Sequence, residues 1–149
     1  IPREYVVDLN SQWQISMDIA NPDPVNYDGV YESFSNYNKN NEYATMYIDF
    51  FGYNTFRLYI RSYAESSYDY VMVSQLDQAI TGNTSYSDST LVKAHTRSSQ
   101  SSGSSISNYQ LVEFPEISDG EHRITIVYRK DSSNHVGTDK GYVLIPKNQ

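Results

Sequence analysis

The stretch Tyr43-Ala44-Thr45-Met46-Tyr47-Ile48-Asp49-Phe50 alternates between apolar and more polar side chains. In an extended chain, Ala44, Met46, Ile48 and Phe50 would share one face, because successive side chains of a strand point to opposite sides. The stretch Thr55-Phe56-Arg57-Leu58-Tyr59-Ile60-Arg61 repeats this pattern. The two stretches predict neighbouring strands with one buried face each, and Gly52-Tyr53-Asn54 between them predicts a hairpin turn.

The same two-residue period recurs along the rest of the chain. The further segments are 4–9, 12–19, 30–34, 68–76, 91–96, 109–114, 121–129 and 141–145. No window of useful length carries the 3.6-residue period of an amphipathic helix. We therefore predict an all-β fold, an antiparallel β-sandwich of eight to nine strands that forms a single domain over residues 1–149.

Composition excludes several classes of function. The chain has 149 residues, no cysteine and a formal net charge of −7. An acidic chain lacks the basic surface that binds nucleic acid, and no apolar run approaches the roughly 20 residues of a membrane helix. Disulfides and thiolate metal sites are excluded as well. The chain begins Ile1-Pro2-Arg3, without a methionine, which favours a trimmed end.

The sequence shows no assembled catalytic motif. It has no Gly-x-Ser-x-Gly elbow and no phosphate-binding glycine loop, and its histidines, His95, His122 and His135, have no metal-ligand spacing. His122 alternates with Ile124 and Ile126, which is typical of a residue within a sheet. We expect a protein that is not an enzyme.

Tyrosine is the unusual feature of the composition: the chain has fifteen tyrosines but only five phenylalanines and one tryptophan. A core needs no hydroxyl, so tyrosine in turns suggests rings that meet both solvent and a polar partner. Tyr31, Tyr37, Asn38 and Tyr53 are the predicted ligand-binding residues, for a glycan or cell-surface polysaccharide. The alternative is that the tyrosines only decorate a sheet. The lone Trp13 lies in a predicted strand and is expected in the core.

The segment Ala64-Glu65-Ser66-Ser67-Tyr68-Asp69-Tyr70-Val71 resembles the Tyr-Asp-Tyr segment of CUB-type extracellular sandwich domains, in which the matching acids help to hold calcium. The resemblance covers fewer than ten residues, and the cysteines of that family are absent. It implies Glu65 and Asp69 as calcium ligands, with calcium as the candidate cofactor. The alternative is that Asp69 accepts backbone hydrogen bonds or pairs with an arginine such as Arg61.

Residues 121–133 and 139–146 resemble the closing hairpin of jelly-roll domains in surface proteins of gut Bacteroidetes and in virion proteins of their phages. Residues 56–76 and 91–100 fit the same style. The resemblance implies a non-catalytic accessory or adhesion domain at a cell surface, outside the cell or on a virion. Two readings stay open: recognition of carbohydrate through tyrosine-rich loops, or a structural virion subunit of a capsid, tail or fibre that contacts other structural proteins.

Overall fold

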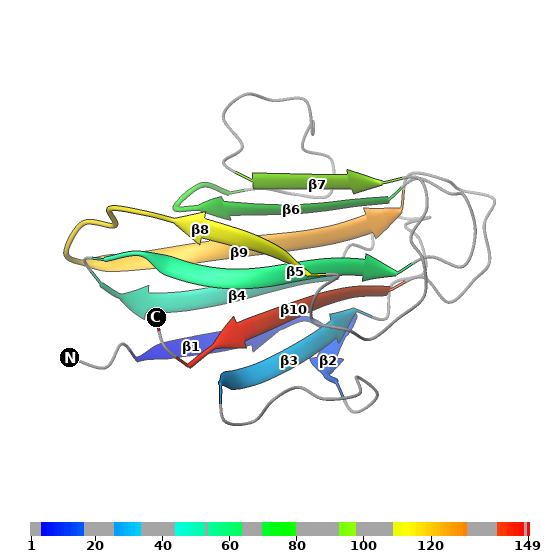
Figure 1. Ribbon diagram of the computed structural model, residues 1–149, viewed down its shortest axis with the longest axis horizontal. Helices are drawn as coiled ribbons and strands as arrows, with labels where there is room; N and C mark the ends of the chain where they lie inside the picture. Colours follow the sequence, from blue (N-terminus) through cyan, green and yellow to red (C-terminus); the bar gives the residue numbers. More distant parts are fainter. Residues whose placement is uncertain are drawn as a thin grey trace.

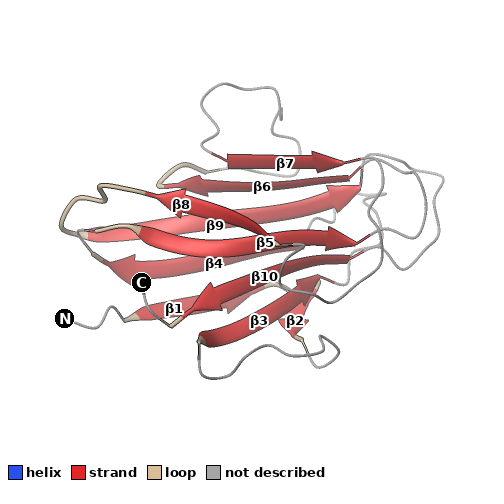
Figure 2. Ribbon diagram, viewed as in Figure 1, coloured by secondary structure: helices blue, strands red, loops and turns tan. Residues whose placement is uncertain are grey.

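The computed structural model describes residues 4–16, 26–33, 44–52, 54–63, 70–79, 93–97, 109–130, 140–147 and 149. These residues form ten strands and no helix (Figure 2). The strands are β1 (Tyr5–Leu9), β2 (Trp13–Ile15), β3 (Tyr27–Ser33), β4 (Ala44–Phe51), β5 (Phe56–Tyr63), β6 (Tyr70–Leu76), β7 (Lys93–Arg97), β8 (Gln110–Phe114), β9 (Glu121–Lys130) and β10 (Lys140–Pro146). The all-β prediction is confirmed. Every predicted segment overlaps a strand, and the described residues hold ten strands where eight to nine were expected.

The strands make two antiparallel sheets that pack face to face (Figure 1). One sheet has the order β1-β4-β9-β6-β7 and the other the order β2-β3-β10-β5-β8. We call them sheet A and sheet B. The predicted antiparallel sandwich is therefore present.

Strands β3 to β10 form nested pairs: the first of them pairs with the last, the second with the second to last, and so on. Strand β3 pairs with β10, β4 with β9, β5 with β8, and β6 with β7. A ribbon of nested antiparallel pairs that is folded across two sheets has the topology of a jelly roll. The described strands thus agree with the jelly-roll-like fold expected from the sequence.

The predicted hairpin at 52–54 is wrong. Strand β4 belongs to sheet A and β5 to sheet B, so this turn crosses between the sheets. Phe50 and Phe56 face each other across the sandwich, with stacked rings whose centroids are 4.8 Å apart. Strands β9 and β10 are also divided between the sheets, so the expected closing hairpin is a crossover as well. A hairpin and a crossover bury the same alternate residues, which is why local alternation does not distinguish them.

The core lies between the sheets and is built from the residues that alternation predicted. Met46, Ile48, Phe56, Leu58 and Ile60 are fully or almost fully buried. Strand β9 contributes Ile124, Ile126 and Tyr128 from its inner face. Trp13 is buried in the same cluster, as expected.

Candidate functional site

The crossover turns of the jelly roll meet at one end of the sandwich. The β4–β5 turn contacts the β8–β9 loop through two backbone hydrogen bonds, Gly52 N to Gly120 O at 3.2 Å and Ile117 N to Asn54 O at 3.1 Å. Strand β6 ends beside them, since Leu76 pairs with Ile124 near the start of β9. Nested strand pairing therefore brings three chain segments together where β4 and β6 end and β9 begins.

A pocket of about 550 Å³ opens at these strand ends. It is lined by Asp49, Phe50, Phe51, Asp77, Glu121, His122 and Arg123. Phe51 is the last residue of β4 and is 60% exposed, which is unusual for a phenylalanine. The pocket combines an exposed aromatic ring with carboxylates and a guanidinium, and we call it the end pocket.

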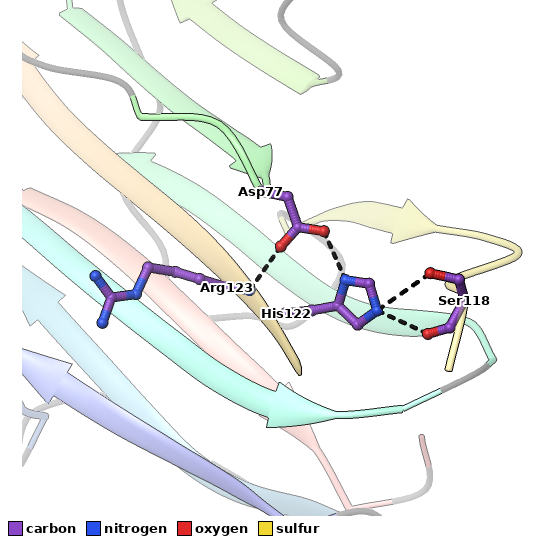
Figure 3. Close-up of polar contacts among 4 residues, drawn as sticks. All are labelled: Asp77, Ser118, His122 and Arg123. Atoms are coloured by element: carbon purple, nitrogen blue, oxygen red, sulfur yellow. Dashed lines mark hydrogen bonds and ion pairs between the residues drawn. The ribbon is translucent and has the colours of Figure 1, made fainter. Parts of the chain in front are cut away.

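Asp77 fastens the end of β6 to the start of β9 (Figure 3). Its Oδ1 accepts a hydrogen bond from the backbone N–H of Arg123 at 2.9 Å, and its own N–H donates to the carbonyl of Arg123 at 2.8 Å. Its Oδ2 lies 2.5 Å from Nδ1 of His122. The backbone of Asp77 has φ 57°, a left-handed conformation that aspartate tolerates better than most residues.

His122 faces an acceptor at each ring nitrogen. Nδ1 meets the Asp77 carboxylate, and Nε2 lies 2.7 Å from the carbonyl oxygen of Ser118 (Figure 3). Both contacts are hydrogen bonds only when both nitrogens carry a proton and donate. The imidazole also packs beside the Phe50 ring, with centroids 5.8 Å apart. The geometry therefore favours a charged, doubly donating imidazolium that joins β6, β9 and the β8–β9 loop.

Asp77, His122 and Ser118 have the residue types of a hydrolase triad, but their geometry differs from one. A general base must accept the serine hydroxyl proton at its free nitrogen. Here Ser118 Oγ is 3.5 Å from Nε2, whereas the Ser118 carbonyl oxygen is at 2.7 Å and requires Nε2 to donate. In this arrangement the histidine ties the loop to the sheet and does not activate the hydroxyl.

Arg123 projects from β9 on the outer face of sheet A. Its Nε and Nη2 donate to the two oxygens of Asp49 at 2.7 and 3.0 Å, and its guanidinium lies 4.5 Å from the centroid of the Tyr47 ring. The hydrogen bonds to Asp49 raise the pKa of Arg123, so its charge is constant. A forked arginine–carboxylate pair of this kind holds both side chains in a defined direction beside the end pocket.

The structure describes one of the six residues that the sequence assigned to binding. Tyr31 lies on the inner face of β3, half-buried against the main core. Burial raises its pKa, with a further contribution from Asp28. Its ring packs so close to Gly29 that a Cβ there would meet the tyrosine hydroxyl at 2.9 Å. A role for Tyr31 in ligand binding stays a prediction.

The other five assigned residues, Tyr37, Asn38, Tyr53, Glu65 and Asp69, lie outside the described residues. Binding by Tyr37, Asn38 and Tyr53, and calcium binding by Glu65 and Asp69, stay predictions. Within the described ranges, no group of three or more histidine and acidic side chains could hold a metal ion. The described residues also contain no helix that is long and apolar enough to cross a membrane.

Sequence reasoning did not find the end pocket. His122 was correctly placed in a sheet, but its partner Asp77 is 45 residues away and stands alone among neutral residues. Phe51 was the available signal: it follows Phe50 directly, so two adjacent phenylalanines point to opposite faces of β4 and one of them must leave the core. Phe51 and Asn54, on either side of Tyr53, border this end of the sandwich, and the assignment of Tyr53 itself stays a prediction.

Comparison with known proteins shows the fold and no family. No protein-family model and no curated protein matches the chain. Among solved structures, a secreted serine protease, VesC from Vibrio cholerae, is similar over 94% of this chain with a TM-score of 0.55 and 7% identity. The chain spans about a quarter (24%) of that protease chain. At this identity the likeness supports the sandwich fold alone.

Two further structural neighbours have lower TM-scores. TmCBM61, solved in complex with β-1,4-galactotriose, has a TM-score of 0.41 and 10% identity, over 95% of this chain and 84% of that one. A glycoside hydrolase family 43 arabinoxylan arabinofuranohydrolase from Bacillus subtilis, solved with cellotetraose, has a TM-score of 0.38 and 14% identity, over 97% of this chain and 26% of that one. The neighbours of this fold thus include both carbohydrate-binding and enzymatic proteins.

Proposed function

We propose that the chain is a non-catalytic binding module that recognises carbohydrate through the end pocket. The observation that carries the proposal is the 60% exposed ring of Phe51 at a pocket whose other lining groups are mostly charged. Ligand sites combine aromatic surface with placed polar groups, and the end pocket has both, with charged and polar groups in the majority.

The pocket's chemistry suits a neutral sugar. The apolar C–H face of a pyranose can pack on the Phe51 ring, while sugar hydroxyls donate to the carboxylates of Glu121 and Asp49. Arg123 is held by Asp49 and offers fixed donors at the same rim. An anionic ligand would be repelled here, because Asp49, Asp77 and Glu121 all line the pocket.

A non-catalytic role is further supported by His122. Its two nitrogens are both occupied by acceptors, so the one histidine of the pocket has no free lone pair for a general base. A site with one exposed ring is expected to bind weakly, and several copies on one cell or particle would supply the avidity of an adhesion module. We place this module outside the cell, at a cell surface or on a virion.

The test is a glycan array probed with a multimerised form of the chain. We expect binding to neutral glycans and its loss in Phe51→Ala. Because Phe51 is exposed, the substitution should change stability by less than about 0.5 kcal/mol. Ile15→Ala is the matched control: it also truncates an exposed apolar side chain, but on an edge strand of sheet B, and should leave binding unchanged.

Two outcomes would contradict the proposal. If Phe51→Ala binds every glycan as the unmodified chain does, the end pocket is not the site, and Tyr53→Ala and Tyr31→Ala become the next variants. If no glycan binds, while the chain is recovered in a stable complex with a structural protein, the virion-assembly alternative replaces carbohydrate recognition.

A further inference from the structure

A row of polar and aromatic side chains crosses the outer face of sheet B. Strand register aligns Gln14 with Glu32, Glu32 with Tyr142, and Tyr142 with Arg61. Ile60 pairs with Gln110, the first residue of β8, so Tyr109, which directly precedes β8, lies next to Arg61. The Arg61 guanidinium lies between two rings, 5.7 Å from the centroid of Tyr142 and 6.0 Å from that of Tyr109.

Arg61 is buried, and two of its three guanidinium nitrogens have no hydrogen-bonding partner among the described residues. Its side chain belongs to a residue that is 3% exposed, and Tyr109 is 8% exposed. Across the residues that the structure describes, Nε and Nη2 of Arg61 and the hydroxyl of Tyr109 make no hydrogen bond. Glu32 is buried in the same row, on the strand beyond Tyr142, and its carboxylate accepts a hydrogen bond from Gln14.

A buried guanidinium with two free donors is costly, because these N–H groups have left water without gaining an acceptor. The contacts with the two tyrosine rings offset part of this cost but leave the N–H groups unsatisfied. Burial raises the pKa of Tyr109, and the charge of Glu32 acts in the same direction, whereas Arg61 lowers it through its charge and its nearness to the hydroxyl. The hydroxyl therefore stays protonated at neutral pH and can donate. Nε and Nη2 of Arg61 and the hydroxyl of Tyr109 are therefore buried polar groups on one face of sheet B that lack a hydrogen bond among the described residues.

We infer that Arg61 and Tyr109 form a site for the carboxylate of an acidic sugar. A carboxylate presents two acceptor oxygens in the plane that the guanidinium fork matches, and the tyrosine hydroxyl adds a third donor. No neutral sugar hydroxyl would compensate the charge of Arg61. This site is distinct from the end pocket, which lies on sheet A and is lined by carboxylates that repel an anion.

The adjoining row of the same face indicates how a sugar would approach. Its members are Val30, Leu144, Tyr59 and Leu111, in strand order. Val30 and Leu144 are buried, Tyr59 is half-buried and Leu111 is 44% exposed, so the face opens toward β8. A sugar ring could pack on Tyr59 and Leu111 while its carboxylate reaches Arg61.

The probe is D-glucuronate, with D-glucose as the neutral match and acetate as the simple carboxylate. In a ¹⁵N NMR spectrum of the full chain, we expect glucuronate to shift the Nε–H signal of Arg61 in a saturable way. Glucose at the same concentration should not shift it. An unshifted signal at saturating glucuronate overturns the site, and an equal response to acetate overturns the assignment to a sugar.

Two variants separate binding from folding. Tyr109→Phe removes only the free hydroxyl, keeps the Arg61 signal and should weaken glucuronate binding by about tenfold, as expected for a hydrogen bond to a charged group. Arg61→Met should abolish glucuronate binding while the free protein melts at the same or a higher temperature, because an uncompensated buried charge is removed. A large fall in melting temperature in Arg61→Met without ligand would show that Arg61 is already paired, and would overturn the inference.

The same variants distinguish this site from the proposed function. Arg61→Met should retain binding of neutral glycans, and Phe51→Ala should retain the glucuronate response. If only one of the two responses is found in the unmodified chain, only the corresponding site is supported.

Discussion

At the scale of single residues, Asp77 is exposed yet connects the end of β6 to the start of β9. Its carboxylate bridges the backbone of Arg123 and the ring of His122, and its backbone adopts a left-handed conformation that most side chains disfavour. His122 in turn holds the β8–β9 loop through the Ser118 carbonyl. The contacts among these lining residues of the end pocket therefore depend on Asp77, although its side chain is 44% exposed.

We predict that Asp77→Ala lowers the free energy of unfolding by about 1–2 kcal/mol, because it removes both side-chain hydrogen bonds and the tolerance of positive φ. Solvent screening at this exposed position keeps the loss below that of a buried pair. Asp77→Asn should lose less, since asparagine keeps an acceptor and tolerates the same φ. Urea denaturation measures the order, with exposed Gln78→Ala as the control. An alanine variant as stable as the unmodified chain would show that the tie contributes nothing.

At the scale of elements, two valines show how burial differs between a central strand and the outer face of an edge strand. Strand β10 lies in the middle of sheet B, and Val143 on its inner face is fully buried against Ile60 and Tyr31. Strand β1 lies at an edge of sheet A, where Val6 on the outer face is 61% exposed. Burial alone separates two residues of the same type.

Val143→Ala and Val6→Ala make a matched pair of truncations. Val143→Ala should cost about 2 kcal/mol, from lost transfer free energy and the cavity left in the core. Val6→Ala should change stability by less than about 0.5 kcal/mol. Chemical denaturation of both variants gives the comparison, and equal losses would contradict the assignment of Val143 to the inner face.

At the scale of the whole molecule, several of the many tyrosines are partly or largely buried and pack within the fold. Burial raises the pKa of Tyr5, Tyr31 and Tyr109 above the ordinary value of 10.0, and a hydrogen bond to Asp28 adds to the effect at Tyr5. Tyr5 also packs edge-to-face on Phe56, so its ring is tied to the core. These tyrosines serve the fold as well as the surface.

The raised pKa values predict alkaline instability. A group whose pKa is higher in the folded state keeps its proton there but loses it when unfolded, so the stability it contributes is complete below pH 10.0 and falls as the pH rises further. The free energy of unfolding should therefore decrease steadily above about pH 10. Absorbance of tyrosinate followed through the titration should show a fraction of the tyrosines ionising only together with unfolding, seen by circular dichroism. Ionisation of all fifteen tyrosines while the fold persists would contradict this.

The sequence by itself determined the strands and the side of each strand that faces the core. Ala44 to Phe50 and Phe56 to Ile60 alternate because each strand has one buried face, and that pattern is complete within a few residues. Alternation also placed His122 in a sheet. These features are local, because the two-residue period of a strand depends only on neighbouring residues.

Only the tertiary structure decided which strands pair and where the candidate sites lie. The turn after Phe51 crosses between sheets because β4 pairs with β9 and β5 with β10 and β8, which no local pattern encodes. Asp77 meets His122 only because β6 and β9 are aligned in register. The aligned row that contains Glu32 and Arg61 likewise spans strands far apart in the chain. A strand's alternation specifies its inward face, whereas its neighbours are chosen by the packing of all ten described strands into one core.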